Sequence, residues 1–198
     1  MSTAQEFVEP DCFYHVYNRA VGNELLFFRK ENYIYFLEKY KKYLSPIVNT
    51  FAYCLIPNHF HFLIRIKPLR GFQTLAGVEP GKLVSRQFSH LFNSYAQAIN
   101  KQQGRKGSLF KNRFKRIKVD DDTYLKQLIL YIHFNPSNHG ICESYRDWKY
   151  SSFSELINKQ SGLLNCDEVI NWFGGLDNFI YCHNIKFELD DEYSLEAD

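Results

Sequence analysis

A strand, a two-residue turn and a second, alternating strand form the feature that most constrains the fold of this chain. Residues 47–56 are rich in β-branched and aromatic side chains and end at the turn Pro57-Asn58. Residues 59–67 then alternate: the apolar residues 60, 62, 64 and 66 point to one face, and the other face carries His59, His61, Leu63 and Arg65. So short a turn predicts that the two strands pair antiparallel.

Helices and further strands are predicted on both sides of this hairpin. Residues 13–19 read as a strand, residues 30–44 and 82–103 as helices with an apolar stripe, and residues 109–119 as a strand entered from a basic loop. The acidic run 120–122 caps a helix over residues 121–135, and Pro136 marks its end. The order β-α-β-β-α-β-α predicts an α+β fold, with an antiparallel sheet, helices packed on one face and a C-terminal extension.

Charge is distributed unevenly along the chain, although the net charge is only +2. Residues 101–118 carry eight Lys or Arg and no acid, whereas residues 187–198 carry six acids and no base. A basic stripe of this kind indicates a polyanionic partner, and the interleaved Phe110 and Phe114 favour that interpretation over a solvated loop. The aromatic share of 17% fits either a ring-rich core or rings that stack on unpaired bases.

The five scattered cysteines include no CxxC pair, so neither a zinc module nor a disulfide framework is predicted. The first nine residues lack the basic start and apolar run of a signal peptide, and no apolar stretch approaches the roughly 18 residues that span a bilayer. We therefore expect one main domain in a reducing cytoplasm.

The histidine pair and a later tyrosine suggest metal-assisted phosphodiester chemistry. Two imidazoles on one strand face suit a divalent cation. On the predicted helix, Gln127, Tyr131 and Asn135 recur every four residues, so one face offers amide oxygens and a phenol. A tyrosine with a pKa of about 10 is a weak nucleophile unless a cation stabilises the charge developing around phosphorus. Taken alone, such a histidine pair on a strand is more often incidental than a metal site, and a helical tyrosine such as Tyr131 is more often a packing residue.

Four segments, in order, resemble single-tyrosine HUH transposases. Residues 53–64 (YCLIPNHFHFLI) resemble the family's His-hydrophobic-His motif, and residues 107–115 (GSLFKNRFK) resemble its later basic strand. Residues 131–136 (YIHFNP), followed by His139-Gly140, resemble its tyrosine helix. Residues 148–152 (WKYSS) are similar to the branch associated with repetitive extragenic palindromes, the REP-associated tyrosine transposases.

This resemblance implies a transposase-like enzyme that nicks and rejoins single-stranded DNA. A ferredoxin-like HUH catalytic domain would span residues 1–155, and residues 156–198 would form a C-terminal extension with an acidic tail. Tyr131 would attack a phosphodiester near a hairpin, form a 5′-phosphotyrosine link and leave a free 3′-hydroxyl. The expected partner is single-stranded or hairpin DNA, and the expected state is a monomer or a homodimer.

The same resemblance assigns the other site residues. His59 and His61 would hold Mg²⁺ or Mn²⁺, with Asn135 as the third ligand and Gln127 or His139 as alternatives. Phosphates would be bound by the basic residues Lys111, Arg113, Lys115, Arg116 and Lys118. Lys111, Arg113 and Lys115 would share one face of the predicted strand, and Arg19, Arg86 and Asn93 are guesses for reading bases.

Two other functions remain open on the sequence alone. A non-cutting hairpin DNA- or RNA-binding protein would keep the basic stripe and the aromatic residues but would not need Tyr131. A hydrolytic phosphoesterase would use metal-bound water as its nucleophile, although few carboxylates lie near the motifs for a two-metal site. Neither alternative forms a covalent link between the tyrosine and DNA.

We predict that the acidic tail competes with DNA for the basic surface. Deleting residues 187–198 should then tighten binding to single-stranded DNA, because six negative charges are removed. Fluorescence anisotropy with a labelled oligonucleotide measures the affinities of the full chain and the shortened chain. Equal affinities would contradict the prediction.

Overall fold

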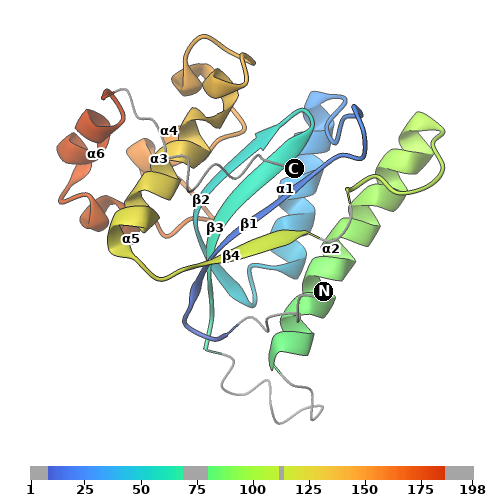
Figure 1. Cartoon of the computed structure of the whole chain (residues 1–198), viewed down its shortest axis with the longest axis horizontal. Coiled ribbons are helices and arrows are strands. Elements are labelled where there is room, and N and C mark those ends of the chain that lie inside the picture. Colours follow the sequence, from blue (N-terminus) through green and yellow to red (C-terminus); the bar gives the residue numbers. More distant parts are fainter. Residues whose placement is uncertain (1–8, 69–79, 112–113, 186–198) are drawn as a thin grey trace, which may run out of the picture.

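A four-stranded antiparallel sheet in the order β2-β3-β1-β4 forms the centre of the molecule (Figure 1). The computed structural model describes residues 9–68, 80–111 and 114–185. Its strands are β1 (Phe13–Arg19), β2 (Val48–Ile56), β3 (His59–Ile66) and β4 (Lys115–Val119). Its helices are α1 (Lys30–Tyr43), α2 (Pro80–Gln103), α3 (Asp122–Asn138), the 3-10 turn η1 (Tyr145–Asp147), α4 (Phe153–Asn158), α5 (Cys166–Trp172) and α6 (Leu176–Cys182).

The predicted acidic tail and Arg113 lie outside the described residues. Within those residues, no helix combines the length and the apolar composition that are needed to cross a bilayer.

The predicted hairpin is confirmed, and it places both motif histidines on a central strand. On one side β3 pairs with β2, where Ile56 lies opposite His59, and on the other side it pairs with β1, where Tyr17 lies opposite His61. The turn is anchored from outside the hairpin, since the Pro57 carbonyl accepts two backbone N–H groups of the segment after β1, at 2.8 and 3.0 Å.

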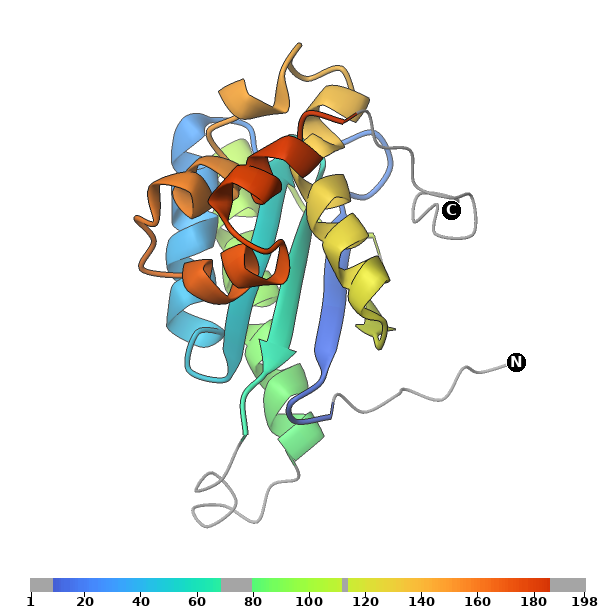
Figure 2. The ribbon, with the colours of Figure 1, turned by 90° about the vertical axis from the view of Figure 1, so that its left-hand side faces the viewer.

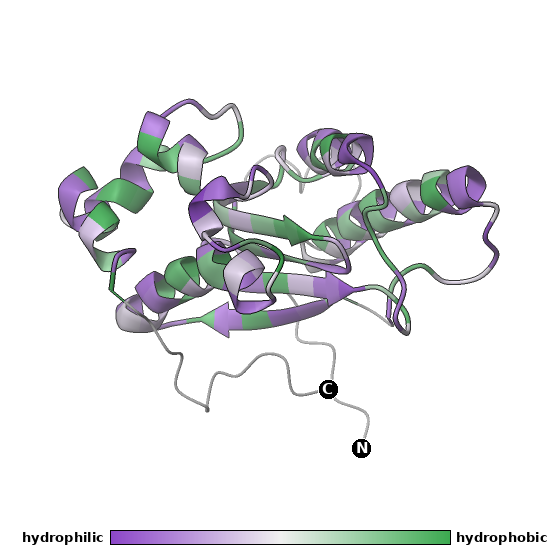
Figure 3. Cartoon of the chain, turned by 90° about the horizontal axis from the view of Figure 1, so that it is seen from above, coloured by the Kyte–Doolittle hydropathy of each residue, from purple (hydrophilic) through white to green (hydrophobic). Residues whose placement is uncertain are grey.

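Helices α1 and α2 cover the apolar face of β3. Phe62 stacks on Tyr40 of α1 with ring centroids 4.3 Å apart, and Phe60 lies 5.2 Å from Phe36 of the same helix. From α2, Phe92 stacks on Phe60 at 5.8 Å, and apolar and polar residues alternate around this helix (Figure 3). Each ring buried in this way contributes about 1.5 to 3 kcal/mol. Polar side chains of β3 that could bind a ligand therefore lie on the opposite face of the sheet.

The helices that follow β4 cover this opposite face (Figure 2). On α5, Trp172 lies 4.9 Å from Phe51 of β2, and Glu168 pairs with Arg65 of β3 at 2.8 Å. The predicted α+β class with an antiparallel sheet is confirmed. The two helices of the β-α-β-β-α-β unit share one face as predicted. The later helices lie on the other face, because the apolar residues of α3 and α5 pack against β2 and β3.

Residues 148–152 protect the outer edge of β2. The Trp148 Nε1–H donates to the carbonyl of Leu55 at 2.8 Å, and the Leu55 N–H donates to the carbonyl of Tyr150 at 2.9 Å. The Tyr150 ring also stacks on Tyr33 of α1, with centroids 3.9 Å apart. An uncovered edge strand offers unpaired N–H and C=O groups to other chains. Residues 148–152 therefore have a structural role: they protect the edge of β2 and pack against α1.

Helix α3 runs past Pro136 to Asn138, so the prediction that it ends at the proline is wrong. Gly140 ends the helix instead, with a φ of 63° that glycine adopts without Cβ strain. The Gly140 N–H donates to Ser137 O at 3.0 Å, and the Ile141 N–H donates to Pro136 O at 2.8 Å. This Schellman ending satisfies two late carbonyls, whereas a proline in the last turn removes one backbone donor.

A buried chain of hydrogen bonds ties α3 to the C-terminal helices. Nε2 of His133 lies 2.7 Å from Ser152 Oγ, and its Nδ1 lies 2.8 Å from Nε2 of His183. His183 Nδ1 lies 2.8 Å from the Phe179 carbonyl. All three contacts are satisfied when the Ser152 hydroxyl and the Nδ1–H of each imidazole donate, which leaves both rings neutral. Burial favours this neutral form and lowers the pKa of His183 to about 4.

We predict that the protein loses stability as the pH falls from 6.5 towards 4. Because the pKa of His183 falls from 6.5 to about 4 on folding, below pH 6.5 the unfolded chain takes up a proton that the folded chain excludes. The stabilising contribution of this neutral imidazole is complete above pH 6.5 and falls by about 3 kcal/mol at most by pH 4. Urea unfolding across this pH range measures the loss.

The variant His183→Gln provides the control for this prediction. Glutamine places a hydrogen-bonding amide where the imidazole of His183 lies, and it removes the group that titrates between pH 4 and 6.5. Its unfolding free energy should therefore vary less with pH than that of the wild type, and an equal pH dependence of the two proteins would count against the assignment to His183.

Candidate functional site

Both predicted metal-binding histidines lie on the face of β3 that α3 covers. His61 is 2% exposed, and His59, the first residue of the strand, is partly exposed. Pairing with β1 places Tyr17 opposite His61 and Arg19 opposite His59. One continuous face of the central strands therefore carries two imidazoles, a phenol and a guanidinium.

The side-chain amide of Asn135 lies within reach of both imidazoles. Its Oδ1 is 3.0 Å from Nε2 of His59, and its Nδ2 is 3.5 Å from Nε2 of His61. Asn135 is fully buried and belongs to α3, one turn after Tyr131. The Nε2 atoms of the two histidines are thus directed at one small polar group, which is the convergence that three ligands of one cation require.

Tyr131 lies beside this group. Its ring centroid is 5.4 Å from that of His61, with the ring planes at 86°, and the residue is 8% exposed. Asn135 shares its helix face because residues four apart on a helix are neighbours. The structure therefore brings together Tyr131, His59, His61 and Asn135, which lie up to 76 residues apart in the sequence.

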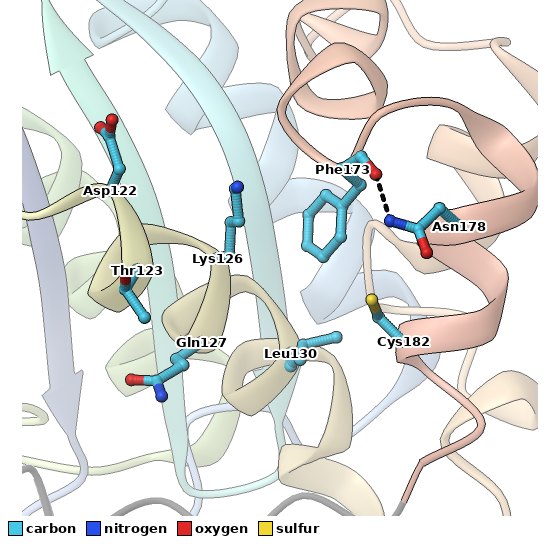
Figure 4. A pocket seen from close by; sticks show the side chains of 8 residues that line it. All are labelled: Asp122, Thr123, Lys126, Gln127, Leu130, Phe173, Asn178 and Cys182. Atoms are coloured by element: carbon cyan, nitrogen blue, oxygen red, sulfur yellow. Dashed lines mark hydrogen bonds between the residues drawn. The ribbon is translucent and has the colours of Figure 1, made fainter.

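The two alternative ligands occupy different positions. The His139 ring lies 4.7 Å from the His59 ring, next to the cluster. Gln127 lines a groove between α3 and the C-terminal helices, together with Lys126, Phe173 and Asn178 (Figure 4). None of the residues that line this groove belongs to the histidine cluster.

His15 of β1 is a neighbour of the site that sequence reasoning missed. Its Nε2 lies 2.9 Å from Nδ1 of His61, and the two rings are nearly coplanar, with centroids 5.1 Å apart and planes at 16°. Its place two residues before Tyr17 on a predicted strand assigns it to the same face as Tyr17. Only the pairing of β1 with β3 brings it to His61, and no local pattern in the sequence reveals that pairing.

Burial keeps the inner imidazoles neutral. It lowers the pKa of His15 to about 3. It also lowers the pKa of His61 well below the usual value, and the neighbouring imidazoles of His15, His59 and His139 act in the same direction. A neutral imidazole keeps a lone pair on one ring nitrogen, which is the form that binds a metal.

The donor set fits a divalent cation that prefers oxygen and nitrogen ligands. In the part of the chain that the structure describes, no three His, Cys, Asp or Glu side chains are grouped to hold a metal, so the third donor that the cluster offers is the Asn135 amide. His59 Nε2–H donates to Asn135 Oδ1 at 3.0 Å; Asn58 Oδ1, 2.9 Å from His59 Nδ1, can accept the proton at Nδ1 instead, which would free the Nε2 lone pair for a cation placed between Nε2 and Oδ1. Adjacent ligands of an octahedral Mg²⁺ are also about 3.0 Å apart.

Strand β4 is shorter than predicted. It covers Lys115–Val119, and before it Phe110 forms an isolated bridge with Ala20. Between that bridge and the Tyr17–Lys115 pair, this segment has two residues more than β1, so a single regular ladder cannot run through both. Lys111 therefore does not share a regular strand with Lys115.

The remaining basic residues of β4 lie on different sides of the sheet. Lys115 pairs with Tyr17 on the histidine face, with its Nζ 5.9 Å from the Tyr17 ring centroid. Arg116 and Lys118 alternate with it and so face the other way. Lys118 also forms an ion pair with Glu9 at 2.9 Å.

Outside β4, two basic residues lie near the start of β3, Arg19 and Lys111. The Lys111 N–H donates to the carbonyl of Arg19 at 2.8 Å, and Arg19 lies opposite His59. Arg86 and Asn93 are exposed on α2, which covers the opposite face of the sheet. The geometry thus supports Arg19 as a neighbour of the site and removes Arg86 and Asn93 from it.

Comparisons with known proteins agree with the resemblance of the motifs. No family model matches the chain. A Haemophilus influenzae protein provisionally assigned as a REP-associated tyrosine transposase is 26% identical over 132 residues, which cover 59% of this chain and 74% of that protein. A solved structure of a REP-associated tyrosine transposase bound to a REP hairpin shares the fold, with a TM-score of 0.61 and 15% identity, over 84% of this chain and 90% of that one. The predicted resemblance to REP-associated tyrosine transposases is thereby confirmed.

We predict that Lys115 contributes more than Lys118 to the binding of single-stranded DNA, because Lys115 lies on the histidine face and Lys118 is paired with Glu9. Loss of one phosphate contact lowers the slope of log affinity against log salt by about 0.7 for a single strand. Lys115→Ala should show this change with an oligo(dT) probe, and Lys118→Ala should change the slope less. A larger effect of Lys118→Ala would contradict the placement of DNA on the histidine face.

Proposed function

We propose that this protein is a metal-dependent, single-stranded DNA endonuclease and strand transferase with Tyr131 as its nucleophile. The observation that carries the proposal is the convergence of His59, His61 and Asn135 beside Tyr131 on one covered face of the sheet. A nucleophile and the ligands of an electrophilic cation need to be neighbours in such a reaction.

The proposed substrate is a DNA single strand that folds into a hairpin. The solved structure with the same fold is that of a REP-associated tyrosine transposase bound to a REP hairpin, and the sequence relative carries the same family assignment. A cationic side chain on the histidine face, Lys115, and the neighbouring Arg19 suit the phosphates of such a strand.

In the proposed reaction, the phenol oxygen of Tyr131 attacks the phosphorus of a phosphodiester. The Tyr131 O–P bond forms, the bond from phosphorus to the 3′ oxygen breaks, and its electron pair leaves with that oxygen. The phenol releases its proton and the leaving 3′ oxygen takes one up. Attack by a 3′-hydroxyl on the 5′-phosphotyrosine reverses these steps, so that rejoining requires no nucleotide cofactor.

His59, His61 and Asn135 would hold Mg²⁺ or Mn²⁺ in this proposal. Such a cation polarises the phosphoryl group and stabilises the developing negative charge. The chain itself positions the groups: β3 fixes both imidazoles, and α3 fixes Tyr131 and Asn135 one turn apart. Packing of the Tyr131 ring against His61 then sets the distance between the tyrosine and the side chains that would bind the cation.

We further propose that residues 1–155 are the catalytic unit and residues 156–198 its extension. The described part of the extension packs on that unit, since Val169 of α5 and Phe179 of α6 are fully buried and Glu168 pairs with Arg65 of β3. The described part of the extension would therefore support the sheet mechanically.

We predict that Tyr131→Phe abolishes a covalent protein–DNA adduct, because phenylalanine lacks the attacking oxygen. Labelled single-stranded hairpins from the flanks of its own gene, incubated with the protein and Mn²⁺, are run on a denaturing gel. A labelled band should migrate with the wild-type protein and be absent with Tyr131→Phe or with EDTA. Tyr181→Phe, at an exposed tyrosine of α6, is the matched control and should form the adduct.

The other outcomes identify the rival functions. Cleaved DNA without an adduct that persists in Tyr131→Phe would make metal-bound water the nucleophile. A shift seen only on a native gel, equal for wild type and Tyr131→Phe, would mark a non-cutting nucleic-acid-binding protein.

A further inference from the structure

His15 is a buried imidazole whose presence is not explained by packing alone. It lies in the middle of β1 at 0% exposure, with its Nε2 2.9 Å from Nδ1 of His61. Its Nδ1 makes no hydrogen bond to any residue in the described ranges. An unsatisfied buried polar atom costs about 1 to 3 kcal/mol, so an aliphatic side chain would be the cheaper choice for a strand interior.

The contact between the two rings constrains the protons of both. A hydrogen bond between two ring nitrogens needs one N–H and one lone pair, so one ring donates and the other accepts. If His15 donates from Nε2, His61 accepts at Nδ1 and carries its proton on Nε2. If His61 donates from Nδ1, its Nε2 keeps the lone pair.

Only the second arrangement leaves His61 able to bind a cation, because its Nε2 is the atom directed at Asn135. The acceptor that holds the proton of His61 on Nδ1 is then Nε2 of His15. In the outer shells of metal sites, such an acceptor fixes both the tautomer and the orientation of the ligating ring. The two rings lie edge to edge and nearly coplanar, with centroids 5.1 Å apart and planes at 16°, so the contact constrains the ring plane as well.

We propose that His15 is a positioning residue that sets the tautomer of His61 and thereby the cation affinity of the site. The inference rests on the proposed function, in which His61 is a ligand. In this tautomer the unsatisfied Nδ1 of His15 carries the proton, and the buried N–H is the energetic cost of holding His61 in the form that binds a cation.

Three variants separate this role from a structural one. His15→Phe keeps a ring of similar size but removes the acceptor, so its affinity for Mn²⁺ should fall by about 10- to 100-fold. His15→Gln keeps an acceptor oxygen and should bind Mn²⁺ close to wild-type affinity. His90→Phe makes the same chemical change at an exposed position of α2, on the other side of the sheet, and should have no effect.

The measurement is made on the full chain without DNA, so that it does not depend on catalysis. Isothermal titration gives the Mn²⁺ affinity of each variant, and the side-chain ¹⁵N signals of His61 in the metal-free protein report which nitrogen carries the proton. Loss of affinity together with a changed His61 tautomer in His15→Phe, and recovery of both in His15→Gln, is the expected result. If His15→Phe does not fold, His15→Leu lacks the acceptor equally and replaces it.

Equal Mn²⁺ affinity and an unchanged His61 tautomer in a folded His15→Phe would overturn the inference and leave the proposed function standing. Failure of the wild-type protein to bind Mn²⁺ through His59 and His61 would instead overturn the proposed metal chemistry. In that case the ¹⁵N signals still decide whether His15 controls the tautomer, because they are recorded without metal.

Discussion

The two-residue period of β3 is the constraint on which the rest of the structure depends. Successive side chains of a strand point to opposite faces, so Phe60 and His61 cannot share a side. The phenylalanine side is fixed by its burial against α1 and α2. A register shift of one residue would bring the imidazoles under these helices and expose the rings to the other side. Apolar packing therefore decides to which face of the sheet His59 and His61 point, independently of the hydrogen bonds of the site.

Helix α3 covers the histidine face and buries its polar side chains, which therefore need hydrogen-bond partners within the protein. Buried imidazoles and amides need partners, and Asn135, His59, His61 and His15 supply them to one another. Among the described residues of this group, the buried atom that lacks a partner is Nδ1 of His15. It belongs to the ring that contacts Nδ1 of His61, and incomplete hydrogen bonding of this kind is expected at a functional site rather than in a purely structural network.

The sequence predicts the features whose signals are local, and misses those that depend on distant pairing. The hairpin and the face of His61 follow from alternation and a two-residue turn, so they could be predicted. The role of His15 depends on contact across 46 residues, which no local pattern encodes. The sequence of the basic run does not show that the segment before β4 has two residues more than the matching part of β1. The faces of Arg116 and Lys118 therefore could not be predicted. Pro136 does not end the helix, because the ending at Gly140 satisfies more backbone groups than the proline removes.

The C-terminal helices influence the site through α3. His133 lies two residues before Asn135 and is held by Ser152 and His183, while Asn135 is held by His59 on the sheet. Rotation of α3 in either direction would break one of these two sets of hydrogen bonds and leave buried polar atoms unpaired. The position of Tyr131 is thus fixed from both sides of its helix. In the proposed role of Tyr131 as nucleophile, this fixation would supply the orientation that would otherwise have to be gained during the reaction.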